Sequence, residues 1–165
     1  MKLKNLIDED FVNYKKPSMV LGFPVCRDFK CDKECGRQVC QNSALATAPT
    51  VRIDDDDIIC RYLRNPITQA VCFQGLEPLD SSIDMMNFII KFREVSNDDI
   101  VIYTGYKKEE INPRIFESLS EYPNIIIKYG RYIPDQKPHY DEVLGVELAS
   151  DNQYAEVVSL NRKKN

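Results

Sequence analysis

Four of the six cysteines fall within one short stretch of the chain, spaced Cys26-x4-Cys31-x3-Cys35-x4-Cys40. Thiolates are soft ligands that suit zinc or an iron–sulfur cluster. A structural zinc site usually takes its cysteines from two separate pairs with a long spacer, whereas ferredoxin-type runs wrap one continuous segment around a cluster. The segment 26–42, here termed the cysteine loop, therefore favours an iron–sulfur cluster, with zinc or unligated thiols as the alternatives.

The rest of the composition narrows the chemistry. The 165 residues include one His and no Trp, which leaves little room for a His-rich zinc site or a Ser-His-Asp triad. Asp plus Glu outnumber Lys plus Arg by 26 to 22, a net charge of −4 that argues against a nucleic-acid partner. Hydrophobic residues make up 43% of the chain, so we expect one folded domain over residues 1–165.

The sequence also predicts the compartment. No apolar stretch approaches the length of a membrane span, and residues 1–10 are charged rather than signal-peptide-like. We therefore expect a cytoplasmic protein without membrane contact, where thiols stay reduced and clustered cysteines serve metal or redox chemistry. Cys60 and Cys72 lie in apolar patterns outside the cysteine loop and are predicted to pack in the core.

Strand and helix patterns alternate along the chain around these residues. Helices are expected to begin at Asp54–Asp57, at Asp80-Ser81-Ser82 and at Asn112-Pro113, where acidic and capping residues precede apolar residues. The second of these helices carries Ile83, Met86, Ile89, Ile90 and Phe92 at helical spacing. Short β-prone runs cover residues 19–23, 68–73, 99–103, 124–128 and 154–160.

Alternating strands and helices indicate an α/β fold of βα units around a mostly parallel sheet. A full eight-unit barrel takes about 250 residues, so we expect a partial (βα) barrel or an open sheet. The cysteine loop directly follows the first core strand of this sheet. Residues 1–16 are expected to be an N-terminal extension, and residues 161–165 a frayed tail.

Four segments together carry a family resemblance. The cysteine loop closes as Cys40-Gln41-Asn42, and residues 73–79 (FQGLEPL) follow a strand. Residues 102–106 (IYTGY) follow the next strand, and residues 129–132 (YGRY) precede residues 150–153 (SDNQ). In this order they resemble the Cys-x-Asn, Gly-Gly-Glu-Pro, Tyr-Thr-Gly-Tyr, Gly-Arg-Phe/Tyr and Gly-Ser-x-Asn-Gln segments of one family. These are the small radical S-adenosylmethionine (SAM) proteins that activate anaerobic ribonucleotide reductase.

The resemblance implies a partial barrel of the radical SAM type and a [4Fe–4S] cluster held by Cys31, Cys35 and Cys40. It implies that the cluster, reduced by a donor such as a flavodoxin, cleaves SAM to a 5′-deoxyadenosyl radical. That radical would generate a glycyl radical on a partner enzyme, an anaerobic ribonucleotide reductase, with no catalytic side chain beyond the cluster and SAM. The residues implied to bind SAM are Val39, Asn42, Gly75, Glu77, Pro78, Thr104, Gly105, Asn152 and Gln153.

Two features depart from the family pattern. The family spacing is Cys-x3-Cys-x2-Cys, whereas four residues separate Cys35 from Cys40, so the loop must bulge. Cys26, Cys31 and Cys35 form an alternative triad. Leu76 stands where the family usually has Gly, and its side chain restricts the backbone beside SAM. Two alternative functions stay open: a radical SAM enzyme acting on another peptide or a nucleotide, and a non-catalytic zinc-binding interaction module.

Overall fold

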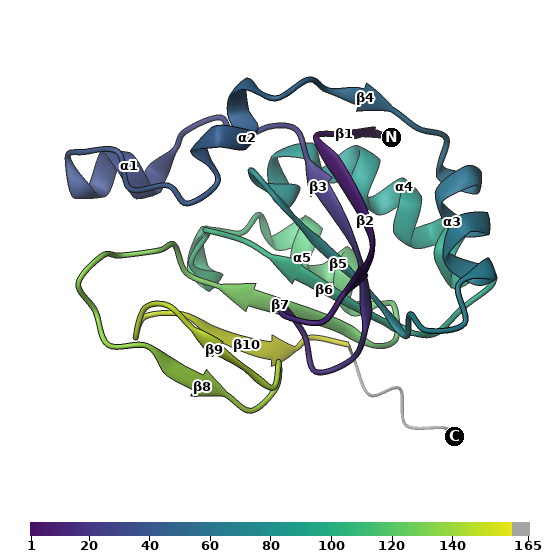
Figure 1. Ribbon diagram of the computed structural model, residues 1–165. Helices are drawn as coiled ribbons and strands as arrows, with labels where there is room; N and C mark the ends of the chain where they lie inside the picture. The colour runs from purple at the N-terminus through teal and green to yellow at the C-terminus, as the bar shows by residue number, and fades with distance from the viewer. Residues whose placement is uncertain (160–165) are drawn as a thin grey trace.

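A six-stranded sheet of order β10-β7-β6-β5-β3-β2 forms the centre of the computed structural model, which describes residues 1–159 (Figure 1). Its four inner strands are parallel to one another, and both edge strands are antiparallel to their neighbours. Within the described residues the two edges do not pair, so the fold is mixed α/β with an open sheet. The strands are β2 (Asn5–Asp10), β3 (Ser18–Phe23), β5 (Ala70–Gly75), β6 (Asp99–Tyr103), β7 (Ile125–Tyr129) and β10 (Tyr154–Val157).

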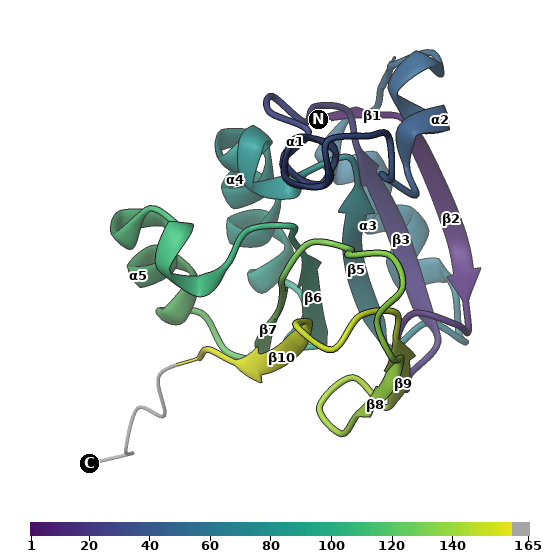
Figure 2. The ribbon, with the colours of Figure 1, turned by 90° about the vertical axis from the view of Figure 1, so that its left-hand side faces the viewer.

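Different elements cover the two faces of the sheet. Helices α3 (Asp55–Arg64), α4 (Ser82–Arg93) and α5 (Pro113–Ser120) lie on one face (Figures 1 and 2). The hairpin of β8 (His139–Asp141) and β9 (Val146–Leu148) lies beside the opposite face, here termed the inner face, where Leu144 and Leu148 are buried. The inner strands β3, β5, β6 and β7 are therefore covered on both faces and are apolar along most of their length, whereas the edge strand β2 is mostly polar.

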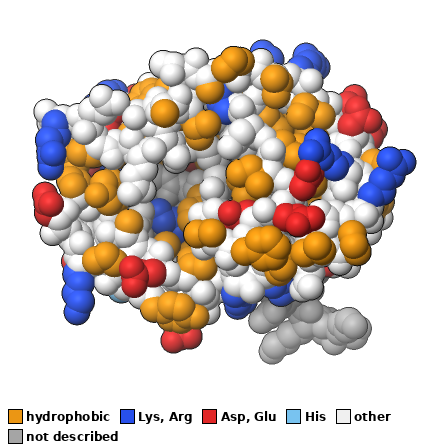
Figure 3. Space-filling view, viewed as in Figure 1, with side chains coloured by type: hydrophobic (Ala, Val, Ile, Leu, Met, Phe, Trp, Pro, Cys, Tyr) orange, Lys and Arg blue, Asp and Glu red, His pale blue; other side chains and the backbone are white. Residues whose placement is uncertain are grey.

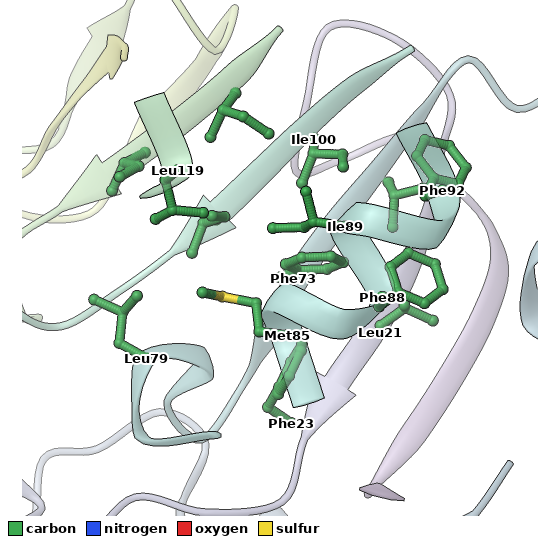
Figure 4. Close-up of a cluster of buried hydrophobic side chains, with 14 of the residues drawn as sticks. Leu21, Phe23, Phe73, Leu79, Met85, Phe88, Ile89, Phe92, Ile100 and Leu119 are labelled. Carbon is green, nitrogen blue, oxygen red and sulfur yellow. The ribbon is translucent and has the colours of Figure 1, made fainter. Parts of the chain in front are cut away.

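Aromatic side chains fill the core between the sheet and α4 (Figure 4). The ring of Phe73 lies 5.7 Å from that of Phe88, centroid to centroid, in an edge-to-face contact. Phe88 in turn stacks on Phe92 at 5.8 Å. Edge-to-face and offset contacts are the arrangements that aromatic quadrupoles favour, so this cluster fixes α4 against β5.

Local sequence signals explain where two of the helices begin. The Asp54 side chain accepts a hydrogen bond from the Asp56 amide and caps α3, whose first turn is acidic as expected. Asn112 caps α5 in the same way by accepting from the Arg114 amide, with Pro113 at the first helical position. The helix starts predicted at these two sites are confirmed.

One prediction about buried side chains was wrong. Cys72 is fully buried on β5 as expected, but Cys60 is exposed because it lies on the outward side of α3. Ile83 on α4 is 77% exposed and Ile90 is exposed as well, because the buried face of this helix runs through Met85, Phe88, Ile89 and Phe92. The apolar residues of α4 thus extend around more than one side, and the sequence pattern alone did not select the buried one.

The N-terminal segment, expected as an extension over residues 1–16, forms strands that pair with the rest of the fold. Residues 5–10 form the edge strand β2, which pairs with β3, and β1 (Lys2–Leu3) pairs with β4 (Val51–Arg52). Leu3 is fully buried in the main core. The tail predicted at residues 161–165 lies outside the described residues. No helix among residues 1–159 is both long and apolar enough to cross a membrane.

Candidate functional site

The carboxyl ends of the parallel strands open into a cavity of about 350 Å³. Figure 3 shows the hollow on this face, with basic surface inside it. Ligand sites of open α/β sheets form at this edge, and small-molecule sites span about 300–1,000 Å³. The walls come from the ends of β5, β6 and β7, the cysteine loop, and the β9 side of the hairpin.

A buried carboxylate, that of Glu77, joins the ends of β5 and β6. Its Oε1 accepts hydrogen bonds from the Thr104 hydroxyl at 2.8 Å and the Leu79 amide at 3.1 Å, and its Oε2 accepts from the Gly105 amide at 2.9 Å. Burial raises the pKa of Glu77 to about 7 and outweighs these three hydrogen bonds, which lower it. The side chain thus titrates near neutral pH, and its hydrogen bonds to Thr104 and Gly105 fix the turn after β6.

Two basic residues on the cavity wall were not predicted from the sequence. Lys128 lies one residue before the end of β7, on the inner face of the sheet, and its Nζ donates to the Gly130 carbonyl at 2.7 Å. Burial lowers the pKa of Lys128 to about 8. Arg131 is 3% exposed; its Nη2 donates to both Glu110 oxygens, while its buried Nη1 has no hydrogen-bond partner in the described structure. For Lys128 the sequence signal was a lysine in an otherwise isoleucine-rich strand, and for Arg131 it was the YGRY segment that carries the family resemblance.

Three of the four loop cysteines, Cys26, Cys31 and Cys40, line the cavity. Burial and the neighbouring Cys40 thiol raise the pKa of Cys31 to about 12, so these two thiols are adjacent. Cys35 is half-buried at the end of α1 (Lys30–Cys35) and does not line the cavity. The structure therefore brings together Cys31 and Cys40 of the predicted triad, and places the alternative ligand Cys26 on the same wall.

Residues 25–153 match the family model described as a 4Fe-4S single cluster domain. The chain belongs to this family. No curated protein and no solved structure matches it. The matched span of this 4Fe-4S single cluster domain includes the whole cysteine loop, the carboxyl edge of the sheet and the hairpin.

The cysteine loop has the right donors for a 4Fe-4S cluster, since soft thiols are the usual ligands of iron–sulfur centres. Among residues 1–159, no three side chains of His, Cys, Asp or Glu already converge at metal-binding distance. Cluster iron would displace the thiol protons, because thiolates are the ligands.

The residues predicted to bind SAM divide into two groups. The Asn42 side chain donates to the Gly75 carbonyl at 2.8 Å and so joins the cysteine loop to the end of β5. Gly75 has a φ of 95°, and a Cβ there would lie 2.5 Å from the Phe23 amide nitrogen, so only glycine fits. The predicted residues that line the cavity are Asn42, Gly75, Glu77, Thr104, Gly105 and Gln153. Val39, Pro78 and Asn152 lie outside its wall.

Asn152 and Gln153 hold the segment after β7 through hydrogen bonds to its backbone. The Asn152 side chain donates to the Arg131 carbonyl at 3.0 Å, and the Gln153 side chain donates to the Gly130 carbonyl at 3.3 Å. Gly130 has a φ of 89°, a conformation that favours glycine. These two amides therefore position the backbone that carries Arg131 into the cavity wall.

Substitution of Glu77 by Gln tests the electrostatics of this site. The pKa of Glu77 is raised from 4.5 to about 7, so its contribution to the free energy of unfolding is fully present below about pH 4.5 and is lost as pH rises through about 7. We expect the unfolding free energy of the wild type, measured in urea, to fall over this interval relative to that of Glu77→Gln. The slope should stay below about 1.4 kcal/mol per pH unit, the limit for one proton.

The exposed Glu121→Gln is the matched control and should keep the wild-type slope. Identical pH dependence in the wild type and in Glu77→Gln would contradict the raised pKa.

Proposed function

We propose that this 4Fe-4S protein is a radical SAM enzyme that generates a glycyl radical on a partner enzyme, an anaerobic ribonucleotide reductase. The supporting observation is that one cavity is lined by three loop cysteines and by Gly75, Glu77, Thr104 and Gly105 of the two motif segments. When bound, the reduced cluster would give one electron to SAM, releasing methionine and a 5′-deoxyadenosyl radical that takes a hydrogen atom from a glycine of the partner.

The sheet topology agrees with a partial (βα) barrel of the radical SAM type. Helices lie on the outside, and the cavity opens at the carboxyl ends of the parallel strands, between the cysteine loop and the hairpin. A barrel that is not closed leaves room for a loop of another protein at the mouth of the cavity. This openness favours a macromolecular substrate, and it also suits another peptide as the alternative.

The side chains around the cavity are suited to the zwitterionic end of SAM. The backbone around Gly75 and the Glu77 carboxylate offer acceptors for an amino group. Lys128 has no ion-pair partner in the part of the chain described, and Arg131 Nη1 has no hydrogen-bond partner there. A buried cation without a counter-charge is unfavourable, so a carboxylate entering this cavity would gain an ion pair with Lys128. Arg131 is already paired with Glu110 and would add a hydrogen bond from its free Nη1.

The wall of the cavity favours Cys26, Cys31 and Cys40 as the ligands over the set that includes Cys35. Cys31 and Cys40 are already adjacent, and Cys26 lies on the same wall close enough to Glu77 and Asp80 for their charges to raise its pKa, after the larger effect of burial. Cys35 sits at the far end of α1.

Single cysteine substitutions test this ligand set. We expect Cys26→Ala, Cys31→Ala and Cys40→Ala to lose the cluster, because each removes a thiolate, and Cys35→Ala to keep it. Iron and sulfide content and the absorption spectrum after anaerobic reconstitution measure the outcome, with the exposed Cys60→Ala as control. Loss on Cys35→Ala together with retention on Cys26→Ala would instead support Cys31, Cys35 and Cys40.

The activity itself is tested by adding SAM and dithionite to the reconstituted protein. We expect 5′-deoxyadenosine and methionine in equal amounts, and a glycyl radical by electron paramagnetic resonance (EPR) when an anaerobic ribonucleotide reductase is present. Replacing the radical-bearing glycine of that partner by alanine is the control and should abolish the signal. Cleavage of SAM without a protein radical would favour a different peptide or a nucleotide, and uptake of zinc alone would favour the interaction module.

A further inference from the structure

The carboxylate of Asp32 closes the cysteine loop. Its Oδ1 accepts hydrogen bonds from the backbone amides of Val39, at 2.7 Å, and Cys40, at 2.8 Å. The Cys31 thiol lies 3.8 Å from the same oxygen. One oxygen atom thus contacts the Cys31 thiol and the backbone amide of Cys40.

This contact explains how Cys40 lies beside Cys31 despite the long spacing between Cys35 and Cys40. Four residues separate Cys35 from Cys40, and they leave α1 through Gly36, whose left-handed φ of 64° turns the chain. The residues of this turn, 36–38, are exposed, so burial does not determine where it returns. The two amides that Asp32 binds are those that bring Cys40 back beside Cys31.

The charge of Asp32 has a second consequence. The reduction potential of an iron–sulfur cluster depends on nearby charge and on hydrogen bonds to its sulfurs. A carboxylate beside Cys31 disfavours the added electron. It also occupies two amides, those of residues 39 and 40, that would otherwise be free to donate to thiolates and raise the potential.

We propose that Asp32 is a positioning residue of the cluster site, which holds Cys40 against Cys31 and lowers the reduction potential of the bound cluster. The proposal rests on the cluster having Cys31 and Cys40 among its ligands. It does not depend on which substrate the enzyme acts upon. A low potential also suits the reduction of SAM in the function proposed above.

A simpler role for Asp32 would be to stabilise α1, since an acidic residue in a first helical turn complements the helix dipole. That role predicts a small loss of helix stability. It predicts no change in the proximity of the two thiols or in the potential. These two quantities therefore separate the roles.

The test compares Asp32→Ala, which removes both hydrogen bonds, with Asp32→Asn, whose amide oxygen can still accept them without the charge. After reconstitution, we expect Asp32→Ala to lose its cluster to a chelator about tenfold faster or more, the lower end of the effect of removing a group that orients metal ligands. We expect Asp32→Asn to keep the cluster and to show a higher midpoint potential by EPR-monitored titration. Asp135→Asn is the matched control, because Asp135 is an exposed carboxylate that contacts the same loop through Arg37.

A readout on the cluster-free protein keeps the loop-closing role testable by itself. In a background without Cys26, Cys35 and Cys60, phenylarsine oxide, which bridges two adjacent thiols, should bind the Cys31–Cys40 pair and bind it about tenfold more weakly after Asp32→Ala. Equal binding in both proteins would overturn the loop-closing role. An unchanged potential in Asp32→Asn would overturn the electrostatic role. Failure of the wild type to form any cluster would contradict the proposed function, while the arsenical assay would still decide the role of Asp32.

Discussion

The shape of the cavity depends on one interaction, the burial of the Glu77 carboxylate between the ends of β5 and β6. A buried carboxylate is costly unless hydrogen bonds satisfy it, and here two backbone amides and the Thr104 hydroxyl do so. These partners come from the segments that follow the two neighbouring strands, Leu79 after β5 and Thr104-Gly105 after β6. The turn at Thr104-Gly105 and the short helix Pro78–Ser81 are therefore fixed relative to each other.

The cysteine loop is joined to this fixed edge at its two ends. At the first end the Arg27 amide donates to Asp80 at 2.7 Å, and the Tyr106 hydroxyl donates to the other oxygen of Asp80 at 2.8 Å. At the second end Asn42 binds the Gly75 carbonyl. These hydrogen bonds and those of Asp32 hold the cysteine loop near the cavity, whereas exposed ion pairs such as Arg37–Asp135 contribute little to stability.

The sequence predicted those parts of the fold and site that depend on local patterns. Buried parallel strands are nearly continuous apolar runs, which is why residues 99–103 and 124–128 were recognised within one residue of β6 and β7. Gly75 and Glu77 were identified because a glycine and an acid after a strand belong to a recognisable motif. The sequence did not indicate which cysteines line the cavity, because α1 is only six residues long and has no apolar pattern that would define a buried side.

Other features depend on how distant segments meet. Lys128 lies on the inner face only because its strand pairs in the register Tyr103↔Lys128, and because the hairpin borders that face. A lysine at this place in the sequence would be equally compatible with an exposed side chain. The same reason explains the wrong prediction for Cys60, since the outward side of α3 is defined by the packing of α4 and the sheet.

The central claim is that the cavity holds a 4Fe-4S cluster to which SAM binds directly. EPR spectra of the anaerobically reconstituted, dithionite-reduced protein with and without SAM test it most directly. We expect the signal of a reduced [4Fe–4S] cluster, and a changed signal once SAM is added, because SAM bound to the cluster would change the surroundings of its iron. A cluster signal that SAM leaves unaltered, or a protein that takes up only zinc, would contradict the account.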